Sequence, residues 1–488
     1  MAALTFSDVQ AVLGSNSGET AWVQQEFENV NLSDTRLNRR LITTAESLAK
    51  SPLSSINEAC DDWAQTQGAY RFFDNDKVTP AKILEHHRQE TSKRMAAHDK
   101  VLVLQDTVFY SYGHHPNTTG LGPIGKDKEN GGSRGLTMHH AIACTITGVP
   151  LGITSQSIFA RKEVSGETTA EKVMRAKYAP IEEKESFKWL VSLRDTMDMA
   201  PKSTKIVTVA DRESDIFEFI AEAKELGSHF VLRAKWDRQL ISEESAGFES
   251  MMEALNAAPV AGATSIEVLS RGGTPPRTAT VEIKFVQVTV RPPDRHGRSK
   301  LSASTEPVML NVISTTEINP PAGVSPLSWS LITDLPVRTF NEALEKVNWY
   351  KQRWMIEIWH KVMKSGCKVE DCLLETGDRL KRYLAVISVI AYRLMRITYL
   401  ARATPDDPCT EVLSDIEWQA LHVRMNKTRP SGAPPSLKDA VRLIGRLGGH
   451  LGRKSDGEPG VTVLWRGWQR LMEDVVMWQA SKSILHKD

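Results

Sequence analysis

Val101-Leu102-Val103-Leu104-Gln105-Asp106 is the stretch that decides the fold of this chain. A short, continuous apolar run of this kind is typical of a strand that is buried on both faces of a sheet. A second such run, Lys205-Ile206-Val207-Thr208-Val209-Ala210-Asp211, follows later, and each run ends in a carboxylate. If the two strands lie side by side and parallel, Asp106 and Asp211 meet at one edge of the sheet, where reactive sites are expected. Taken singly, either aspartate is more often a turn or cap residue.

The segments around these runs predict how the sheet is built. Strands are expected at 137–147, 151–157 and 230–233, with a turn at 148–150; helical stretches are expected at 169–199, with a break near Pro180, and at 214–226. The order strand, hairpin, helix, strand, helix, strand predicts an α/β fold in which helices cover a mixed sheet. A mostly β segment follows. Its basic loop, 291–300, is either a solvated hairpin tip or an arm that contacts a nucleic-acid backbone.

A third informative stretch runs from Tyr350 to Lys364 and has the pattern of a helix. At about 100° per residue, its polar members fall within roughly 80° of arc. They are Tyr350, Arg353, Glu357, Lys361 and Lys364, whereas Met355, Trp359, Val362 and Met363 point the other way. Such a polar front suits phosphate and a metal ion, while the apolar back can be buried. The alternative is an amphipathic surface helix, in which charges spaced i, i+4 contribute a few tenths of a kcal/mol per pair.

Composition limits the remaining classes of protein. A length of 488 residues favours about two to four domains, and 41% hydrophobic residues support a globular protein. The formal net charge is only +1, so any surface that binds nucleic acid must be local. The five cysteines lack a paired CxxC pattern, which argues against a disulfide framework or a zinc site.

The location is expected to be a reducing cytoplasm, without membrane association. Met1-Ala2-Ala3-Leu4 does not begin a signal-peptide pattern, and the most apolar segment, Leu384 to Tyr392, is too short to span a bilayer. It belongs to a long buried helix expected from Leu380 to Ala403, and a linker-like break at 404–408 precedes a helical tail.

A helical pattern also covers the N-terminal region from about residue 20 to 75. Ser33 or Asp34 is a plausible N-cap for a helix with several basic residues. These include Arg36, Arg40 and Lys50. Arginines in the first turns of a helix suit phosphate contact or groove entry, although a solvated helix face has the same pattern.

Two strand-end aspartates and a helical glutamate supply the oxygen ligands that hard divalent cations require. Asp106, Asp211 and Glu357 therefore form a candidate site for Mg²⁺, with Mn²⁺ as a substitute. Two such ions can activate an attacking hydroxyl and stabilise the leaving oxygen in phosphodiester transfer.

With these residues in place, the chain resembles the DDE transposases with the Tyr-Arg-Glu-Lys signature (insertion-sequence family four), typified by the transposase of the bacterial composite kanamycin-resistance transposon. The signature is complete as Tyr350, Arg353, Glu357 and Lys364. Further matches extend the resemblance over nearly the whole chain. They are Asp106-Thr107, Asp211-Arg212-Glu213, Lys184-Glu185-Ser186 with Lys188-Trp189-Leu190, and Gly68-Ala69-Tyr70-Arg71-Phe72.

The resemblance implies an RNase H-like mixed sheet flanked by helices, with a mostly β insertion before the last catalytic helix. It implies a helical domain that binds transposon ends at 1–76 and a catalytic core at 77–403, with the insertion at about 236–340. A helical dimerisation domain is implied at 404–488.

The resemblance also implies a cut-and-paste reaction. Asp106, Asp211 and Glu357 are then the catalytic acids, holding two Mg²⁺ ions. Nicking at the transposon end frees a 3′-hydroxyl, which attacks the opposite strand to form a hairpin; hairpin opening and strand transfer follow. The implied partners are double-stranded DNA with terminal inverted repeats, target DNA and a second copy in a synaptic homodimer. The implied location is the bacterial cytoplasm, at the nucleoid when DNA is bound.

Individual DNA contacts carry over by position. Trp329 matches the residue that stacks on a flipped base, Tyr350 and Arg353 match residues that hold its phosphate, and Arg233 matches a further contact. The remaining expected contacts are Lys361, Lys364, Arg36, Arg40 and Lys50. The chain departs from the relative at Leu37, where an arginine is expected, and in the sparser basic loop at 291–300. The alternative for Trp329 is a core tryptophan in a strand.

Two other functions remain open at this stage. One is a metal-dependent nuclease that uses the same acids without pairing two DNA ends and tolerates any sequence. The other is a binding-only regulatory protein derived from a transposase.

Overall fold

A ten-stranded sheet runs through the middle of the computed structural model, which describes residues 21–60, 62–125, 133–162, 168–241, 247–268, 276–293, 306–430, 432–453 and 456–485. Its strands are β1 Lys100–Ser111, β2 Gly122–Pro123, β3 Arg134–Thr145, β4 Pro150–Phe159, β5 Lys205–Ala210, β6 His229–Arg233, β7 Val260–Val268, β8 Arg277–Val290, β9 Val308–Glu317 and β10 Ser328–Thr333. The strand order is β2-β3-β1-β5-β6-β10-β9-β8-β7, and β4 pairs with β3.

The predicted mixed sheet is confirmed. β5 is parallel to both β1 and β6, and the other described strand pairs are antiparallel. The apolar run from Val101 to Leu104 is fully buried, as expected for a central strand.

One detail of the prediction is wrong, because β1 does not end at Asp106. The strand continues to Ser111, paired with β3, whereas its parallel neighbour β5 ends at Ala210. The antiparallel partner β3 supplies the backbone hydrogen bonds that β1 needs beyond Asp106. Asp106 therefore lies beside the end of β5. It is at the edge of the sheet where the sequence predicts that it meets Asp211.

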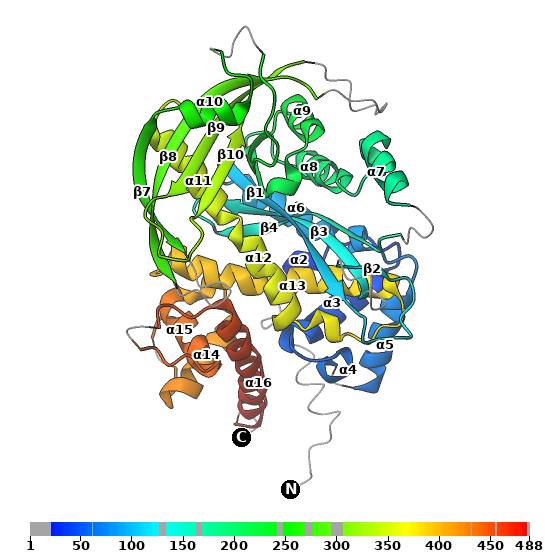
Figure 1. The fold of residues 1–488 in the computed structure, drawn as a ribbon. Coiled ribbons are helices and arrows are strands. Elements are labelled where there is room, and N and C mark those ends of the chain that lie inside the picture. Colours follow the sequence, from blue (N-terminus) through cyan, green and yellow to red (C-terminus); the bar gives the residue numbers. More distant parts are fainter. Residues whose placement is uncertain are drawn as a thin grey trace.

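The predicted β insertion extends this same sheet. β10 pairs with β6 on one side and β9 on the other, and β8 and β7 follow outward. Together with α10 (Met251–Ala257) these strands form one end of the molecule in Figure 1. Of the basic loop at 291–300, residues 294–300 lie outside the described residues.

Helices cover the sheet and form both terminal regions. The N-terminal helices are α2 Ala21–Phe27, α3 Thr35–Lys50, α4 Ile56–Ala59, α5 Trp63–Asp74 and α6 Pro80–Met95; the core helices are α7 Thr169–Tyr178, α8 Phe187–Met199, α9 Phe217–Glu225, α11 Phe340–Gln352, α12 Trp354–Lys361 and α13 Gly377–Ala403. The C-terminal helices are α14 Asp415–Asn426, α15 Leu437–Leu447 and α16 Val461–Leu485. Asp34 is the N-cap of α3, as one of the two predicted residues.

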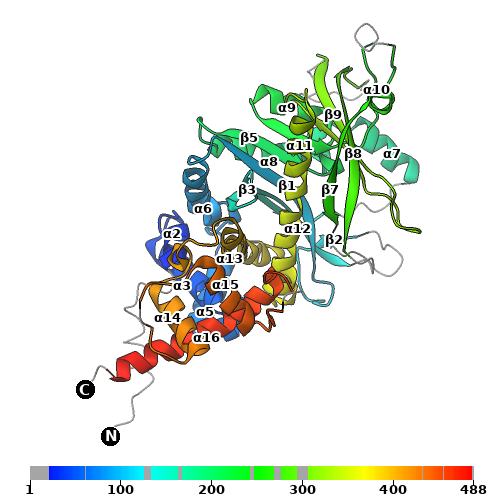
Figure 2. The ribbon, with the colours of Figure 1, turned by 90° about the vertical axis from the view of Figure 1, so that its left-hand side faces the viewer.

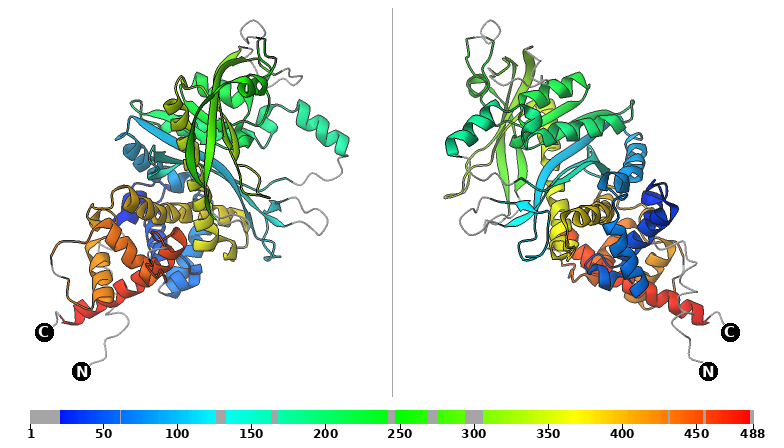
Figure 3. Two further views of the ribbon diagram at one scale, coloured as in Figure 1. Left: turned by 60° about the vertical axis from the view of Figure 1, so that its left-hand side comes forward. Right: turned by 90° about the vertical axis from the view of Figure 1, so that its right-hand side faces the viewer.

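The terminal regions lie together at the end of the molecule opposite the insertion. Figures 2 and 3 show the blue N-terminal helices beside the orange and red C-terminal helices, and α16 contacts α3 directly. α13 packs against both groups and against β4. By length and composition α13 could cross a membrane, but 83% of its most apolar window is buried inside the fold, which is the position of a core helix.

The stretch from Tyr350 to Lys364 is not the single helix that was predicted. α11 ends at Gln352, α12 begins at Trp354, and a π-helical turn spans Val362–Gly366. The break is a tight turn at Arg353, where the Arg353 amide donates to the Tyr350 carbonyl at 3.1 Å. Tyr350 consequently lies on the first helix and is buried rather than displayed on the polar front.

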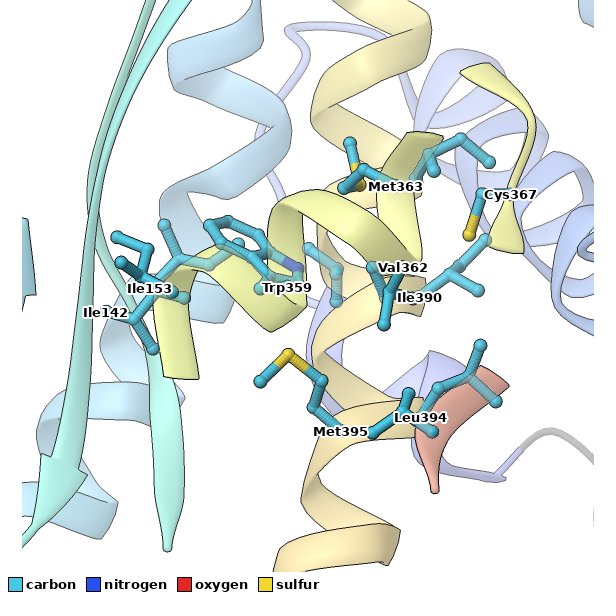
Figure 4. Close-up of a cluster of buried hydrophobic side chains, with 14 of the residues drawn as sticks. Ile142, Ile153, Trp359, Val362, Met363, Cys367, Ile390, Leu394 and Met395 are labelled. Atoms are coloured by element: carbon cyan, nitrogen blue, oxygen red, sulfur yellow. The ribbon is translucent and has the colours of Figure 1, made fainter. Parts of the chain in front are cut away.

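The apolar back of this stretch is buried as predicted. Figure 4 shows Trp359, Val362 and Met363 packed among Ile142 and Ile153 of the sheet and residues of α13. Met355 is buried in the same core. This packing fixes α12 against the sheet, with Glu357 on its other side.

Candidate active site

Two strands and one helix bring the three predicted acids together. In the parallel pairing of β1 and β5, Gln105 lies opposite Ala210, so Asp106 and Asp211 follow at neighbouring positions. Asp211 caps a short 3₁₀ turn (Arg212–Ser214), accepting a hydrogen bond from the Glu213 amide at 2.9 Å. Glu357 lies in α12, which packs against β1.

Arg353 connects two of these acids. Its Nη1 lies 3.2 Å from Oδ2 of Asp106, and its Nη2 donates to Oε1 of Glu357. The pair with Glu357 has the i, i+4 spacing of a helix, and the packing of α12 against β1 brings Arg353 to Asp106. The Nε of Arg353 is buried, and within the described part of the chain it has no hydrogen-bond partner. In this structure the residue expected to hold a phosphate thus pairs with two of the three carboxylates of the acid cluster (Asp106, Asp211 and Glu357).

The acid cluster has an excess of negative charge. Burial raises the pKa of Asp106 to about 6, and the charges of Asp211 and Glu357 add to this rise, whereas Arg353 and the Thr107 amide oppose it. Burial alone would lower the pKa of Arg353, but Tyr350, Asp106 and Glu357 raise it well above its ordinary value. Arg353 therefore remains a cation beside Asp106 and Glu357.

The carboxylates of Asp106, Asp211 and Glu357 are chemically suitable ligands for a divalent cation. Carboxylate oxygens are the ligands that hard divalent ions prefer, and a guanidinium cation already lies between two of the three acids. As they stand, no three His, Cys, Asp or Glu side chains in the described ranges converge tightly enough to hold a metal ion. The three carboxylates are of the right chemical type for such an ion, but in this structure Arg353 pairs with two of them.

Trp329, Tyr350 and Arg233 lie close to one another. The ring centroids of Trp329 and Tyr350 are 5.3 Å apart with an interplanar angle of 66°. Arg233, at the end of β6, donates through Nη2 to the Ser328 carbonyl at 3.3 Å, next to Trp329 in β10. Trp329 is partly exposed and Tyr350 is buried, so the tryptophan is the ring open to a ligand.

The two lysines of the signature stretch are not equivalent. Lys361 ends α12 and is exposed. Lys364 lies in the π-helical turn, where its Nζ is 3.4 Å from Oε1 of Glu370 and 5.8 Å from the centroid of Tyr110. Glu370 also accepts a hydrogen bond from the Ser111 amide at 2.6 Å, so Lys364 is held at the far end of β1.

The N-terminal cations belong to α3, in the helical region that precedes the sheet. Arg36 is exposed and forms a 3.1 Å ion pair with Asp34. The Arg40 guanidinium lies directly over Gly68 of α5, where an added Cβ would meet it at 2.4 Å. Lys50 lies in the last turn of the same helix and is partly buried. The structure does not bring these three side chains to the acid cluster.

A buried histidine pair beside the acids was not predicted. His140 lies opposite Asp106 in the pairing of β1 with β3, and its Nδ1 is 3.2 Å from Nε2 of His360. Burial lowers the pKa of both rings, that of His360 to about 3, so both are neutral. The pair joins the strand beside Asp106 to the helix that carries Glu357. Only the position of His360, three residues after Glu357, gave any signal in the sequence.

Three family models match the chain. A transposase DNA-binding model matches residues 19–78, a transposase DDE model matches 190–394, and a Tn5 transposase dimerisation model matches 389–483. The DDE match contains Asp211 and Glu357 and begins after Asp106. These matches support a DNA transposase of the DDE class.

The particular kind follows from the third match. The dimerisation model is that of the Tn5 transposase, so the three matches support a Tn5-like DDE transposase, an enzyme that binds DNA and forms dimers. A solved structure of a piggyBac transposase synaptic complex with hairpin DNA is also similar, at 9% identity over 80% of this chain and 77% of that chain, with a TM-score of 0.37.

Proposed function

We propose that this protein is a cut-and-paste transposase that nicks transposon ends, forms and opens a DNA hairpin and transfers the ends into target DNA. The observation that carries the proposal is the acid cluster. Asp106 and Asp211 follow adjacent parallel strands, and Glu357 faces them from a helix linked to Asp106 through Arg353. In the proposal these three carboxylates are the catalytic acids of phosphodiester cleavage.

The same acids would hold two Mg²⁺ ions, with Mn²⁺ as a substitute. When bound, the ions supply positive charge that activates an attacking hydroxyl and stabilises the leaving oxygen. With the ions bound, Arg353 would no longer pair with Asp106 and Glu357 and would be available to a DNA phosphate. Burial of Asp106 beside Asp211 and Glu357 favours this exchange. The carboxylates would then lie next to doubly charged ions in place of the single positive charge of Arg353.

The expected DNA contacts divide into two groups. Trp329 stacks on a base that leaves the duplex at the hairpin, and Tyr350, Arg233, Lys361 and Lys364 contact the phosphates; the contact between Trp329 and Tyr350 supports this group. Arg36, Arg40 and Lys50 of α3 contact the transposon end, which the match to a DNA-binding model supports.

The proposal includes the organisation of the chain and its partners. Residues 1–76 bind the terminal inverted repeats, 77–403 form the catalytic core with an insertion at about 236–340, and 404–488 mediate a synaptic homodimer. The protein acts in the bacterial cytoplasm, at the nucleoid, as a member of insertion-sequence family four.

Glu357→Gln tests the role of the acids without removing the side chain. We expect this variant to bind a duplex with the terminal repeat as the wild type does, yet to cleave it at least about 100-fold more slowly, because one carboxylate of the cluster is lost. Glu345→Gln, on the neighbouring helix α11, makes the same change where the carboxylate pairs with Lys346, and should cleave normally. Normal cleavage by Glu357→Gln would overturn the proposal.

A further inference from the structure

Trp236 is an exposed tryptophan at the edge of the sheet that carries Asp211. Its side chain is 57% exposed and follows directly after β6. β5 and β6 are parallel, with Ala210 opposite Leu232, so the chain leaves both strands at the same edge. Asp211 is the first residue after β5, and Lys235 and Trp236 lie in the segment that follows β6.

A buried carboxylate fixes the backbone at Trp236. Oδ2 of Asp215 accepts hydrogen bonds from the amides of Lys235 at 2.7 Å and of Trp236 at 3.0 Å. Its Oδ1 lies 2.6 Å from Nη2 of Arg238, and the Asp215 side chain is completely buried. Removing such an anchor would leave a buried charge without its partners, so this backbone is held firmly.

The anchor also links Trp236 to a catalytic acid. Asp215 lies four residues after Asp211, just beyond the 3₁₀ turn that Asp211 caps. The loop that presents the acid therefore also sets the position of the tryptophan. An exposed ring contributes little to packing, so the hydrogen bonds to Asp215 are not needed to hold it in the core. They would serve a ring that must keep a fixed position to contact a ligand beside Asp211.

A cation lies beside the exposed ring, and a second one precedes it in the chain. Nζ of Lys235 lies 5.0 Å from the ring centroid of Trp236. Arg233, two residues before Lys235, reaches the Ser328 carbonyl beside Trp329. An exposed aromatic ring with neighbouring cations is the arrangement that binds unpaired nucleic-acid strands, because bases stack on the ring and phosphates meet the charges.

We propose that Trp236 stacks on an unpaired base of the DNA strand that leaves the acid cluster, as a second aromatic platform besides Trp329. This inference rests on the proposed function and adds a residue that determines how an open strand is held. Lys235 and Arg233 meet the phosphates of the same strand. Stacking is tolerant of sequence, so the platform acts on any base.

Equilibrium binding of two DNA duplexes tests this platform with the full chain. Both carry the terminal repeat; one is blunt, and the other ends in a short unpaired strand containing 2-aminopurine. Divalent metal is left out so that no cleavage occurs. We expect Trp236→Ala to bind the duplex with the unpaired strand about tenfold more weakly and the blunt duplex unchanged. Trp236→Phe should restore most of the affinity, because it retains a ring.

Met309→Ala is the matched control, since Met309 is 59% exposed on β9 and its loss should change neither affinity. Quenching of 2-aminopurine fluorescence by the wild type, lost in Trp236→Ala, would support direct stacking. Equal weakening on both duplexes, or weakened dimerisation with unchanged DNA affinity, would overturn the inference while leaving the proposed function intact. If the wild type binds neither duplex, the inference and the proposed function both fail.

Discussion

Asp106 lies in an environment that disfavours its own charge. Burial raises its pKa from 3.8 to about 6, so the unfolded chain releases this proton more readily than the folded protein does. The contribution of this group to folding stability therefore falls as the pH rises from about 4 to about 6 and is constant above that range. An acid retained at such a cost in stability is typical of a functional site.

Asp106→Asn should consequently stabilise the protein in the absence of metal. We expect the free energy of unfolding at pH 7 to rise by about 1–3 kcal/mol, since a shift of about two pKa units sets the upper limit. The gain should disappear below about pH 4, where aspartic acid and asparagine are both neutral. Urea titrations at both pH values measure it. A lower unfolding free energy at pH 7 would contradict this account of the site.

Trp329 permits a test of a single step in the reaction. Its ring contacts Tyr350, packs at the margin of the core and is partly exposed, so replacing it with alanine removes a stacking surface. We expect Trp329→Ala to nick DNA at the wild-type rate but to form hairpins about tenfold more slowly or worse, because only the hairpin needs the extruded base. Trp329→Phe should retain partial activity. Loss of both steps together would indicate a folding defect.

At the scale of elements, sequence patterns predicted the strands better than the helix that completes the site. The two apolar runs ending in aspartate identified β1 and β5, because strands buried on both faces leave a continuous apolar signal. The break between α11 and α12 left none, since Gln352-Arg353-Trp354 contains neither glycine nor proline. Arg353, which contacts Asp106 and Glu357, lies at that break.

The contact between His140 and His360 joins α12 to β3. Replacing His360 with leucine leaves the buried Nδ1 of His140 without its partner, and we expect the unfolding free energy to fall by about 1–3 kcal/mol. α12 should then be held less firmly, so affinity for Mn²⁺, measured by calorimetry without DNA, should also fall. His360→Gln retains a polar group near Nε2 and should recover part of both. Unchanged metal affinity in His360→Leu would show that the pair does not position Glu357.

At the scale of the whole molecule, the net charge of +1 gives little sign of a partner as acidic as DNA. The cations are instead local, on α3 and around the acid cluster, and many pair with neighbouring carboxylates. Terminal helical regions at one end and an extended sheet at the other spread these sites over the molecule, as Figure 1 shows. The family motif therefore identified the partner where the overall charge could not.

Local cations should still give a steep salt dependence. We expect the slope of log affinity against log salt to flatten by about 0.9 for each phosphate contact that is removed. Arg36→Ala and Arg40→Ala test α3, and Lys224→Ala, an exposed lysine on α9, is the control that should leave the slope unchanged. Slopes that stay unchanged for both arginines would remove α3 from the DNA surface.

In the proposed reaction, one acid cluster both nicks DNA and forms a hairpin. The most direct measurement resolves the products of a labelled terminal-repeat duplex on a denaturing gel, with Mg²⁺ and with Asp106→Ala as the control. We expect a nick followed by a fast-running hairpin with the wild type, and neither with the variant. Cleavage of any duplex without hairpins, or binding without cleavage, would contradict the account and favour a nuclease or a regulatory protein, respectively.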